Sequence, residues 1–239
     1  TREELAKDFG EDLSTVNARI RAVDRLLFTA RRLRTAPPRD EKVITAWNGY
    51  MVTALAEAGQ LLNQPRFRQA AEETARFILS VLYDEKPNVL YRDWRAGQRG
   101  VAGFAEDYAA MTEGLLALYS LDGKQPWLTA AKNLTDVQVK LFWDAKEGGF
   151  YGAGQDPSLW LREKSANDNV TPSVSAMSVG NLLKLGSLTR DRSYTEKAVR
   201  TAAWQGGMLH ETPEAMPYTL VNWPILLAQT TRPESLKTR

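Results

Sequence analysis

The side chains best suited to chemistry in this 239-residue chain are carboxylates, amides and aromatic rings near the starts of predicted helices. Carboxylates and amides can hydrogen-bond the hydroxyl groups of a sugar, and indole rings can stack on the apolar faces of pyranoses. The pattern therefore favours a carbohydrate site. The candidate substrate-binding residues are Trp47, Asn48, Arg92, Trp94, Glu106, Tyr108 and Ser173.

Asp107 and Asp168 are the candidate catalytic residues, because paired carboxylates are the one acid–base arrangement that the sequence offers. At a separation of about 5–5.5 Å they could act as acid and nucleophile, and at about 6.5–9.5 Å as acid and base around a water. The sequence leaves both possibilities open. It also leaves open that Asp and Ser at helix starts are ordinary caps, with Trp47 and Tyr108 in the core.

Composition argues against several other kinds of site. The chain has no cysteine, which removes disulfides, thiol nucleophiles and Cys-ligated zinc, and its single histidine, His210, rules out a histidine pair. No phosphate-binding loop, dinucleotide fingerprint, zinc motif or nucleophile elbow is present. We therefore predict no metal and no cofactor, and we interpret His210 as a surface residue.

Charge and hydropathy limit the partners. A formal net charge of +2 is too small to predict binding to nucleic acid or to a membrane surface. No apolar run approaches the roughly 20 residues of a membrane span. No signal-peptide pattern opens the chain, so a cytoplasmic protein is expected. The hydrophobic content of 43% is enough for a substantial core.

An internal repeat indicates how the candidate residues could be brought together. Phe67 and Trp127 are 60 positions apart in matching contexts, and a weaker third copy places Tyr194 a further 67 positions on. Each copy predicts a hairpin of an apolar first helix and an amphipathic second helix. The first helices are expected over 46–62, 104–120 and 173–188, and the second helices over 65–82, 126–142 and 191–205.

Alternating apolar and amphipathic helices predict an all-α fold, a partial α/α toroid of three hairpins plus flanking helices, with short β-hairpin loops. In a toroid the first helices form an inner ring, buried nearly all round, and their starts share one opening. A solenoid of stacked helix pairs is the alternative. The repeat is longer than the roughly 34–47 residues of common helical solenoids, which favours the toroid.

Two domains are expected. Residues 1–36 read as an N-terminal helical arm and linker, with one helix over 14–34. Residues 37–239 read as an incomplete toroid domain with a polar end from Thr230. Pro37 and Pro38 end the arm because proline cannot continue a helix. The arginines before them suit either an anion-binding arm or cations at a helix C-terminus in a solvated linker.

Five ordered motifs resemble the thioredoxin-domain-containing family related to spermatogenesis-associated proteins. They are DEKVITAWNG at 40–49, YRDW at 91–94, GFAEDY at 103–108, ND at 167–168 with TPS at 171–173, and EAMP at 214–217. The resemblance runs through nearly the whole chain. It implies an (α/α)6 barrel similar to N-acylglucosamine 2-epimerases and six-hairpin glycosidases, joined in the family to a thioredoxin-like domain, with no established molecular activity.

The sequence departs from that family in three respects. The thioredoxin-like domain and the first part of the barrel are absent, and the family's usual Pro-Ser-Gly/Ala-Asn-Ser reads PSVSA at 172–176. The chain thus looks like a C-terminal fragment or a truncated homologue. An epimerase-type mechanism is further weakened by the single histidine.

Two functional hypotheses follow. In the first, the chain binds or modifies a small sugar-like ligand, in an epimerase-like or glycosidase-like way or as an inactive remnant. In the second, it is a non-catalytic interaction scaffold associated with a thioredoxin-like redox partner. An open half-ring would leave inner apolar helices uncovered, so we also expect a homo-oligomer.

Overall fold

The computed structural model describes residues 1–230, so all but the first residue of the polar end lies outside it. It divides the chain into two compact units, Thr1–Glu41 and Lys42–Arg239. The first unit holds α1 (Arg2–Phe9) and α2 (Leu13–Arg32). The apolar periodicity does not predict α1. The sequence feature that marks the start of α1 is a capping box, in which the Thr1 hydroxyl accepts a hydrogen bond from the Glu4 N–H.

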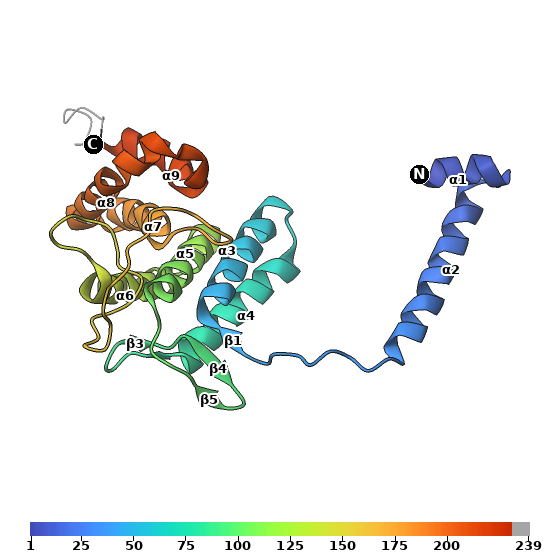
Figure 1. The fold of residues 1–239 in the computed structure, drawn as a ribbon, viewed down its shortest axis with the longest axis horizontal. Coiled ribbons are helices and arrows are strands. Elements are labelled where there is room, and N and C mark those ends of the chain that lie inside the picture. Colours follow the sequence, from blue (N-terminus) through green and yellow to red (C-terminus); the bar gives the residue numbers. More distant parts are fainter. Residues whose placement is uncertain (231–239) are drawn as a thin grey trace. The chain divides into compact units, whose positions relative to one another are not determined.

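The second unit is built from alternating inner and outer helices (Figure 1). The inner helices pack side by side in chain order: α3 (Thr45–Leu61), α5 (Ala105–Asp122), α7 (Val174–Thr189) and α9 (Pro217–Thr230). The outer helices are α4 (Pro65–Val81), α6 (Gln125–Phe142) and α8 (Arg192–Glu211), and each packs on the inner helix that precedes it. The three predicted hairpins are confirmed, and α9 follows the third as a further inner helix.

Short strands occupy the loops. β1 (Val43–Ile44), β4 (Asp93–Arg95) and β5 (Gln98–Arg99) form an antiparallel sheet in the order β1-β4-β5, with Val43 opposite Trp94. β2 (Tyr83–Asp84) pairs with β3 (Val89–Leu90) as an antiparallel hairpin, and η1 (Pro213–Ala215) precedes α9. The first sheet holds the segment around Arg92 against the start of α3, because the Thr45 N–H donates to the Arg92 carbonyl at 2.8 Å.

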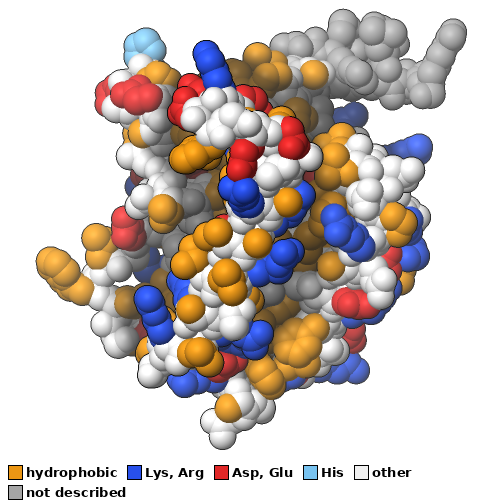
Figure 2. Space-filling model, turned by 90° about the vertical axis from the view of Figure 1, so that its right-hand side faces the viewer, with side chains coloured by type: hydrophobic (Ala, Val, Ile, Leu, Met, Phe, Trp, Pro, Cys, Tyr) orange, Lys and Arg blue, Asp and Glu red, His pale blue; other side chains and the backbone are white. Residues whose placement is uncertain are grey.

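Helix α8 extends beyond its predicted end at residue 205. Gly206 and Gly207 lie inside it and have open space around them. Glycine lowers the stability of a helix without necessarily ending it. His210 is therefore in the last turn of α8 rather than in a loop, and its exposure confirms the predicted surface position (pale blue in Figure 2). In the view of Figure 2, basic side chains are interspersed with hydrophobic ones.

The inner helices differ in burial. Helix α5 is buried along nearly its whole length, and α7 is similar. The expectation of burial nearly all round is wrong for α3, where Trp47 is 62% and Met51 53% exposed. Within the part of the chain that the structure describes, α3 has an inner neighbour, α5, on one side only. At the other end of the row, Val221 and Ile225 of α9 are also exposed.

Helices α3 and α5 cross closely at two glycines. A Cβ built on Gly49 would lie 2.6 Å from the Ala110 carbonyl carbon, and one on Gly114 would lie 2.9 Å from a methyl of Val52. Any larger residue at Gly49 would have to displace the main chain of α5. This crossing sets the distance between the first two inner helices and so the spacing of their starts.

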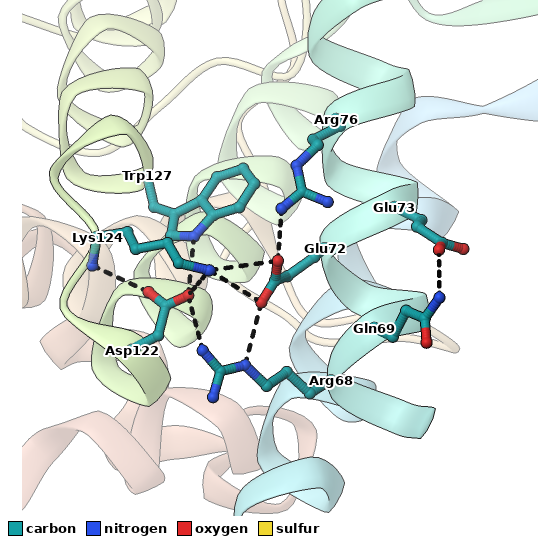
Figure 3. Close-up of polar contacts among 8 residues, drawn as sticks. All are labelled: Arg68, Gln69, Glu72, Glu73, Arg76, Asp122, Lys124 and Trp127. Atoms are coloured by element: carbon teal, nitrogen blue, oxygen red, sulfur yellow. Dashed lines mark hydrogen bonds and ion pairs between the residues drawn. The ribbon is translucent and has the colours of Figure 1, made fainter. Parts of the chain in front are cut away.

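A network of ion pairs ties the outer helix α4 to the turn between α5 and α6 (Figure 3). Glu72 accepts from Arg68 at 3.1 Å and Arg76 at 2.5 Å, and lies 3.3 Å from the Lys124 ammonium. Lys124 also pairs with Asp122 at 2.9 Å. Because about half of each basic side chain is exposed to solvent, we expect each pair to contribute little to stability.

Candidate functional site

The starts of α3 and α5 are joined by one carboxylate, that of Asp107. It is fully buried; its Oδ1 accepts from the Ala46 N–H at 3.0 Å and its Oδ2 from the Phe104 N–H at 2.9 Å. The first N–H groups of a helix have no partner within the helix. Helix α3 has no side-chain cap of its own, since Ile44 is its N-cap, so Asp107 supplies an acceptor from another helix.

A third donor reaches the same carboxylate. The Arg92 guanidinium lies 3.3 Å from Asp107 Oδ2. Burial raises the pKa of Asp107 to about 6, while the Phe104 N–H, Arg92 and the Ala46 N–H oppose that rise. The group is thus a desolvated carboxylate whose two oxygens are both occupied by donors of the protein.

Asp168 joins α7 and α9 in the same way. Its Oδ1 accepts from the Ser173 N–H at 2.7 Å and its Oδ2 from the Tyr218 N–H at 2.7 Å. Ser173 is the N-cap of α7, and its hydroxyl accepts from the Ala176 N–H at 3.3 Å. Each candidate catalytic aspartate therefore bridges the starts of two neighbouring inner helices.

Glu106 connects the starts of the middle helices in the row of inner helices. Its Oε1 accepts from the Tyr50 hydroxyl of α3 at 3.0 Å and from the Thr171 hydroxyl, just before α7, at 3.3 Å. Its Oε2 lies 4.0 Å from the Arg92 guanidinium. Together with the two aspartates, Glu106 draws the starts of all four inner helices to one end of the unit, as the toroid predicts.

A pocket of about 550 Å³ opens beside these helix starts, within the size range of small-molecule sites. Its polar lining is Arg92, Glu106, Glu163, Ser165, Asn167, Asn169, Thr171 and Ser173. Its apolar lining includes Phe104, Phe150, Leu159, Leu161 and Val174. The pocket thus combines hydrogen-bonding groups with apolar surface, as a site for a hydroxylated ring requires.

Three of the predicted site residues, Arg92, Glu106 and Ser173, line this pocket. Asp107 and Asp168 lie behind it, holding the helix starts through the contacts above. Arg92 also stacks on Phe104, with its guanidinium carbon 5.1 Å from the ring centre. That contact fixes the arginine at the edge of the pocket.

The remaining predicted residues lie elsewhere. Trp47 is on the open face of α3, and the Asn48 side-chain amide donates to the Ile44 carbonyl at 2.8 Å. Trp94 packs edge-on against Phe77 of α4, with ring centres 5.8 Å apart. Tyr108 is 1% exposed, and its hydroxyl accepts from the Leu90 N–H at 3.0 Å. Their assignment to ligand binding stays a prediction.

Sequence reasoning missed two parts of the site. Tyr50, whose hydroxyl donates to the pocket-lining Glu106, lies one turn beyond the helix start, so it was not among the candidates. The loop before α7 contributes Leu159 and Leu161, which flank the fully exposed Trp160. The signal was an apolar run, Leu-Trp-Leu, inside an otherwise polar and turn-rich segment.

Comparison with known sequences identifies relatives. No protein-family model matches the chain. Over 229 residues it is 34% identical to spermatogenesis-associated protein 20 of Homo sapiens, an alignment that covers 90% of this chain and 29% of that protein. An uncharacterized protein of Caenorhabditis elegans is 28% identical over 223 residues, covering 91% and 30% respectively. The chain spans about three tenths of the length of these relatives, and the predicted resemblance is confirmed.

Solved structures with a similar fold include sugar epimerases and glycosidases. A GH76 α-mannanase of Bacteroides thetaiotaomicron has a TM-score of 0.63 at 14% identity, over 84% of this chain and 56% of that one. A cellobiose 2-epimerase of Spirochaeta thermophila has a TM-score of 0.57 at 17% identity, over 71% and 44%. These are (α/α)6 toroids, so the predicted partial toroid is confirmed over the solenoid. At such identities the likeness is one of fold alone.

In residues 1–230 no helix combines the length and the apolar character that a membrane span would need.

Proposed function

We propose that this chain, a homologue of spermatogenesis-associated protein 20, binds a small carbohydrate in the pocket beside the inner-helix starts. The observation that carries the proposal is Glu106: a carboxylate that lines the pocket, has one oxygen held by Tyr50 and Thr171, and has its other oxygen 4.0 Å from Arg92. A carboxylate held in this way is oriented to accept hydrogen bonds from ligand hydroxyls.

The rest of the lining supports the same ligand class. Arg92, Asn167 and Asn169 supply donors, and Phe104, Leu159 and Leu161 supply apolar surface for the C–H face of a pyranose. The fold shared with a mannanase and a cellobiose epimerase is consistent with this choice. A cytoplasmic location, permitted by the absence of cysteine, is also part of the proposal.

Catalysis by Asp107 and Asp168 conflicts with the hydrogen bonds that these two groups make. Both oxygens of each group accept main-chain N–H bonds, so either aspartate would have to release a helix start before acting on a ligand. Binding through Glu106 needs no such release. We therefore propose Glu106 as the ligand-contacting carboxylate and the two aspartates as the groups that position it.

Binding of D-mannose, D-glucose and cellobiose, measured by saturation-transfer NMR and calorimetry, tests this function. We expect Glu106→Gln to weaken binding about tenfold or more, because a charge-assisted hydrogen bond is replaced by a neutral one. Glu196→Gln, an exposed position on α8, is the matched control. Absence of binding by the wild-type protein, or equal binding by Glu106→Gln, would count against the proposal.

The second candidate is an interaction scaffold, favoured by the exposed apolar side chains at the two ends of the helix row. Trp47 and Met51 of α3 and Val221 and Ile225 of α9 are each about half exposed or more. Apolar surface of this kind commonly marks a protein interface. Under this candidate the chain forms a homo-oligomer or holds a thioredoxin-like partner, and light scattering at micromolar concentration tests the first of these.

A further inference from the structure

A second pocket, of about 460 Å³, is lined by side chains from all four inner helices. Its charged and phenolic members are Glu57 of α3, Glu113 of α5, Lys184 of α7 and Tyr218 of α9. It shares no lining residue with the pocket beside the helix starts. The proposed function does not use this second group of side chains.

Glu113 is the polar centre of the pocket. It is half-buried, and its Oε1 accepts a hydrogen bond from the Tyr218 hydroxyl. Burial raises the pKa of Glu113, and the neighbouring Glu57 acts in the same direction. Among the described residues, no hydrogen bond uses Glu113 Oε2, so one oxygen of this desolvated carboxylate is available to a molecule in the pocket.

Lys184 complements Glu113 without touching it. The Lys184 side chain is exposed as a whole, but partial burial of its amine lowers the pKa of Lys184, and the charges of Glu113 and Glu57 oppose that effect. In the part of the chain that the structure describes, no ion pair within 4.0 Å and no hydrogen bond holds this ammonium. The cation and the carboxylate lie on the wall of one cavity, near enough to influence each other but not in contact. This arrangement leaves room for a ligand atom between them.

The charges select the class of ligand. Two carboxylates against one ammonium disfavour an anion. Within residues 1–230 no group of three or more acidic or histidine side chains could hold a metal ion. A neutral hydroxyl group can accept from Lys184 and donate to Glu113 at once. Leu116, Val221 and Ile225 supply the apolar wall on which the carbon skeleton of such a molecule would lie.

We propose that this pocket is a second binding site, for a neutral polyhydroxylated molecule of monosaccharide size held between Glu113 and Lys184. The inference stands apart from the proposed function, since the two pockets have different linings. The two sites can be followed separately, because Ile225 and Val221 report on this pocket and Leu159 and Val174 on the other.

The experiment is a titration of the full chain, with its Ile, Leu and Val methyl groups labelled, with myo-inositol and with D-mannose by NMR. We expect saturable shifts of the Ile225 and Val221 methyls. Glu113→Gln and Lys184→Met should each weaken that affinity about tenfold or more, whereas Glu106→Gln should change it less than twofold. Saturable shifts confined to Leu159 and Val174 would overturn this inference and leave the proposed function intact.

A second measurement uses the wild-type protein, so the proposal can be tested even if the variants fail to fold. In the wild-type protein, saturating myo-inositol should slow acetylation of Lys184 by acetic anhydride, followed by mass spectrometry, several-fold relative to the exposed Lys146. Lys184→Arg should keep more of the affinity than Lys184→Met, because the charge and donors remain. Equal acetylation with and without the polyol, or tighter binding of inorganic phosphate than of inositol at Ile225, would refute the proposal.

Discussion

Replacing Asp107 by asparagine removes the acceptor that joins α3 to α5. The wild-type carboxylate takes the Ala46 N–H on one oxygen and the Phe104 N–H and Arg92 on the other. An asparagine has one acceptor oxygen and an NH2 group that only donates. Whichever way the amide is turned, its NH2 faces a main-chain N–H, and at least one buried donor loses its partner.

Two effects of opposite sign set the difference in the free energy of unfolding between the wild-type protein and Asp107→Asn. A buried N–H without a partner costs about 1–3 kcal/mol. Against this, a carboxyl group whose pKa rises from 3.8 to about 6 on folding contributes about 3 kcal/mol of stability when protonated, which is lost when it ionises. Because the folded pKa is the higher one, that stability is fully present below pH 3.8 and disappears as the pH rises through about 6. Asparagine cannot titrate, so the variant lacks this dependence.

Urea unfolding followed by far-UV circular dichroism at pH 4 to 8 gives both quantities. We expect the wild-type protein to be the more stable at pH 4, and its advantage over Asp107→Asn to shrink by about 3 kcal/mol by pH 7.5. Glu196→Gln, on the exposed face of α8, should track the wild-type curve throughout. Parallel curves for wild type and Asp107→Asn, or an advantage that widens with pH, would refute this account of the buried carboxylate.

Three further outcomes are expected. Gly49→Ala should lower the free energy of unfolding, measured with urea, by about 1–3 kcal/mol or more, because its Cβ meets the α5 main chain. Gly206→Ala in α8, with open space around it, should raise the same quantity by about 0.5–1 kcal/mol. Lys164→Met should lower the free energy of unfolding by about 3 kcal/mol at pH 7, because it leaves the buried carboxylate of Asp144, 2.7 Å from the ammonium, without its charged partner. The lysine's contribution is present above the ordinary pKa of Asp, so this loss should diminish as the pH falls below 4. Light scattering at micromolar concentration should give a dimer or larger species that Trp47→Glu and Ile225→Glu dissociate, and a monomeric wild type would contradict the homo-oligomer.

The sequence predicted the hairpins because their signals are local. Apolar periodicity located the inner helices, and Pro65 and Pro126 stood in the first turns of two outer ones. The acceptor for the start of α3 was not local. Thr45 is of a residue type that often caps a helix, yet it lies inside α3, and the acceptor comes from Asp107, 61 positions from Ala46. Only the packing of α3 on α5 brings these residues together.

The same limit applies to the candidate catalytic pair. An acid at a helix start has two uses that a sequence cannot separate: it can accept the free N–H groups there, or it can meet a ligand. The structure separates them by hydrogen-bonding capacity. Asp107 and Asp168 have main-chain donors on both oxygens, whereas Glu106 and Glu113 each have one oxygen that accepts no described hydrogen bond and that lines a pocket. We therefore propose that ligand binding in this fold belongs with the glutamates, and that the aspartates serve to hold the helix starts.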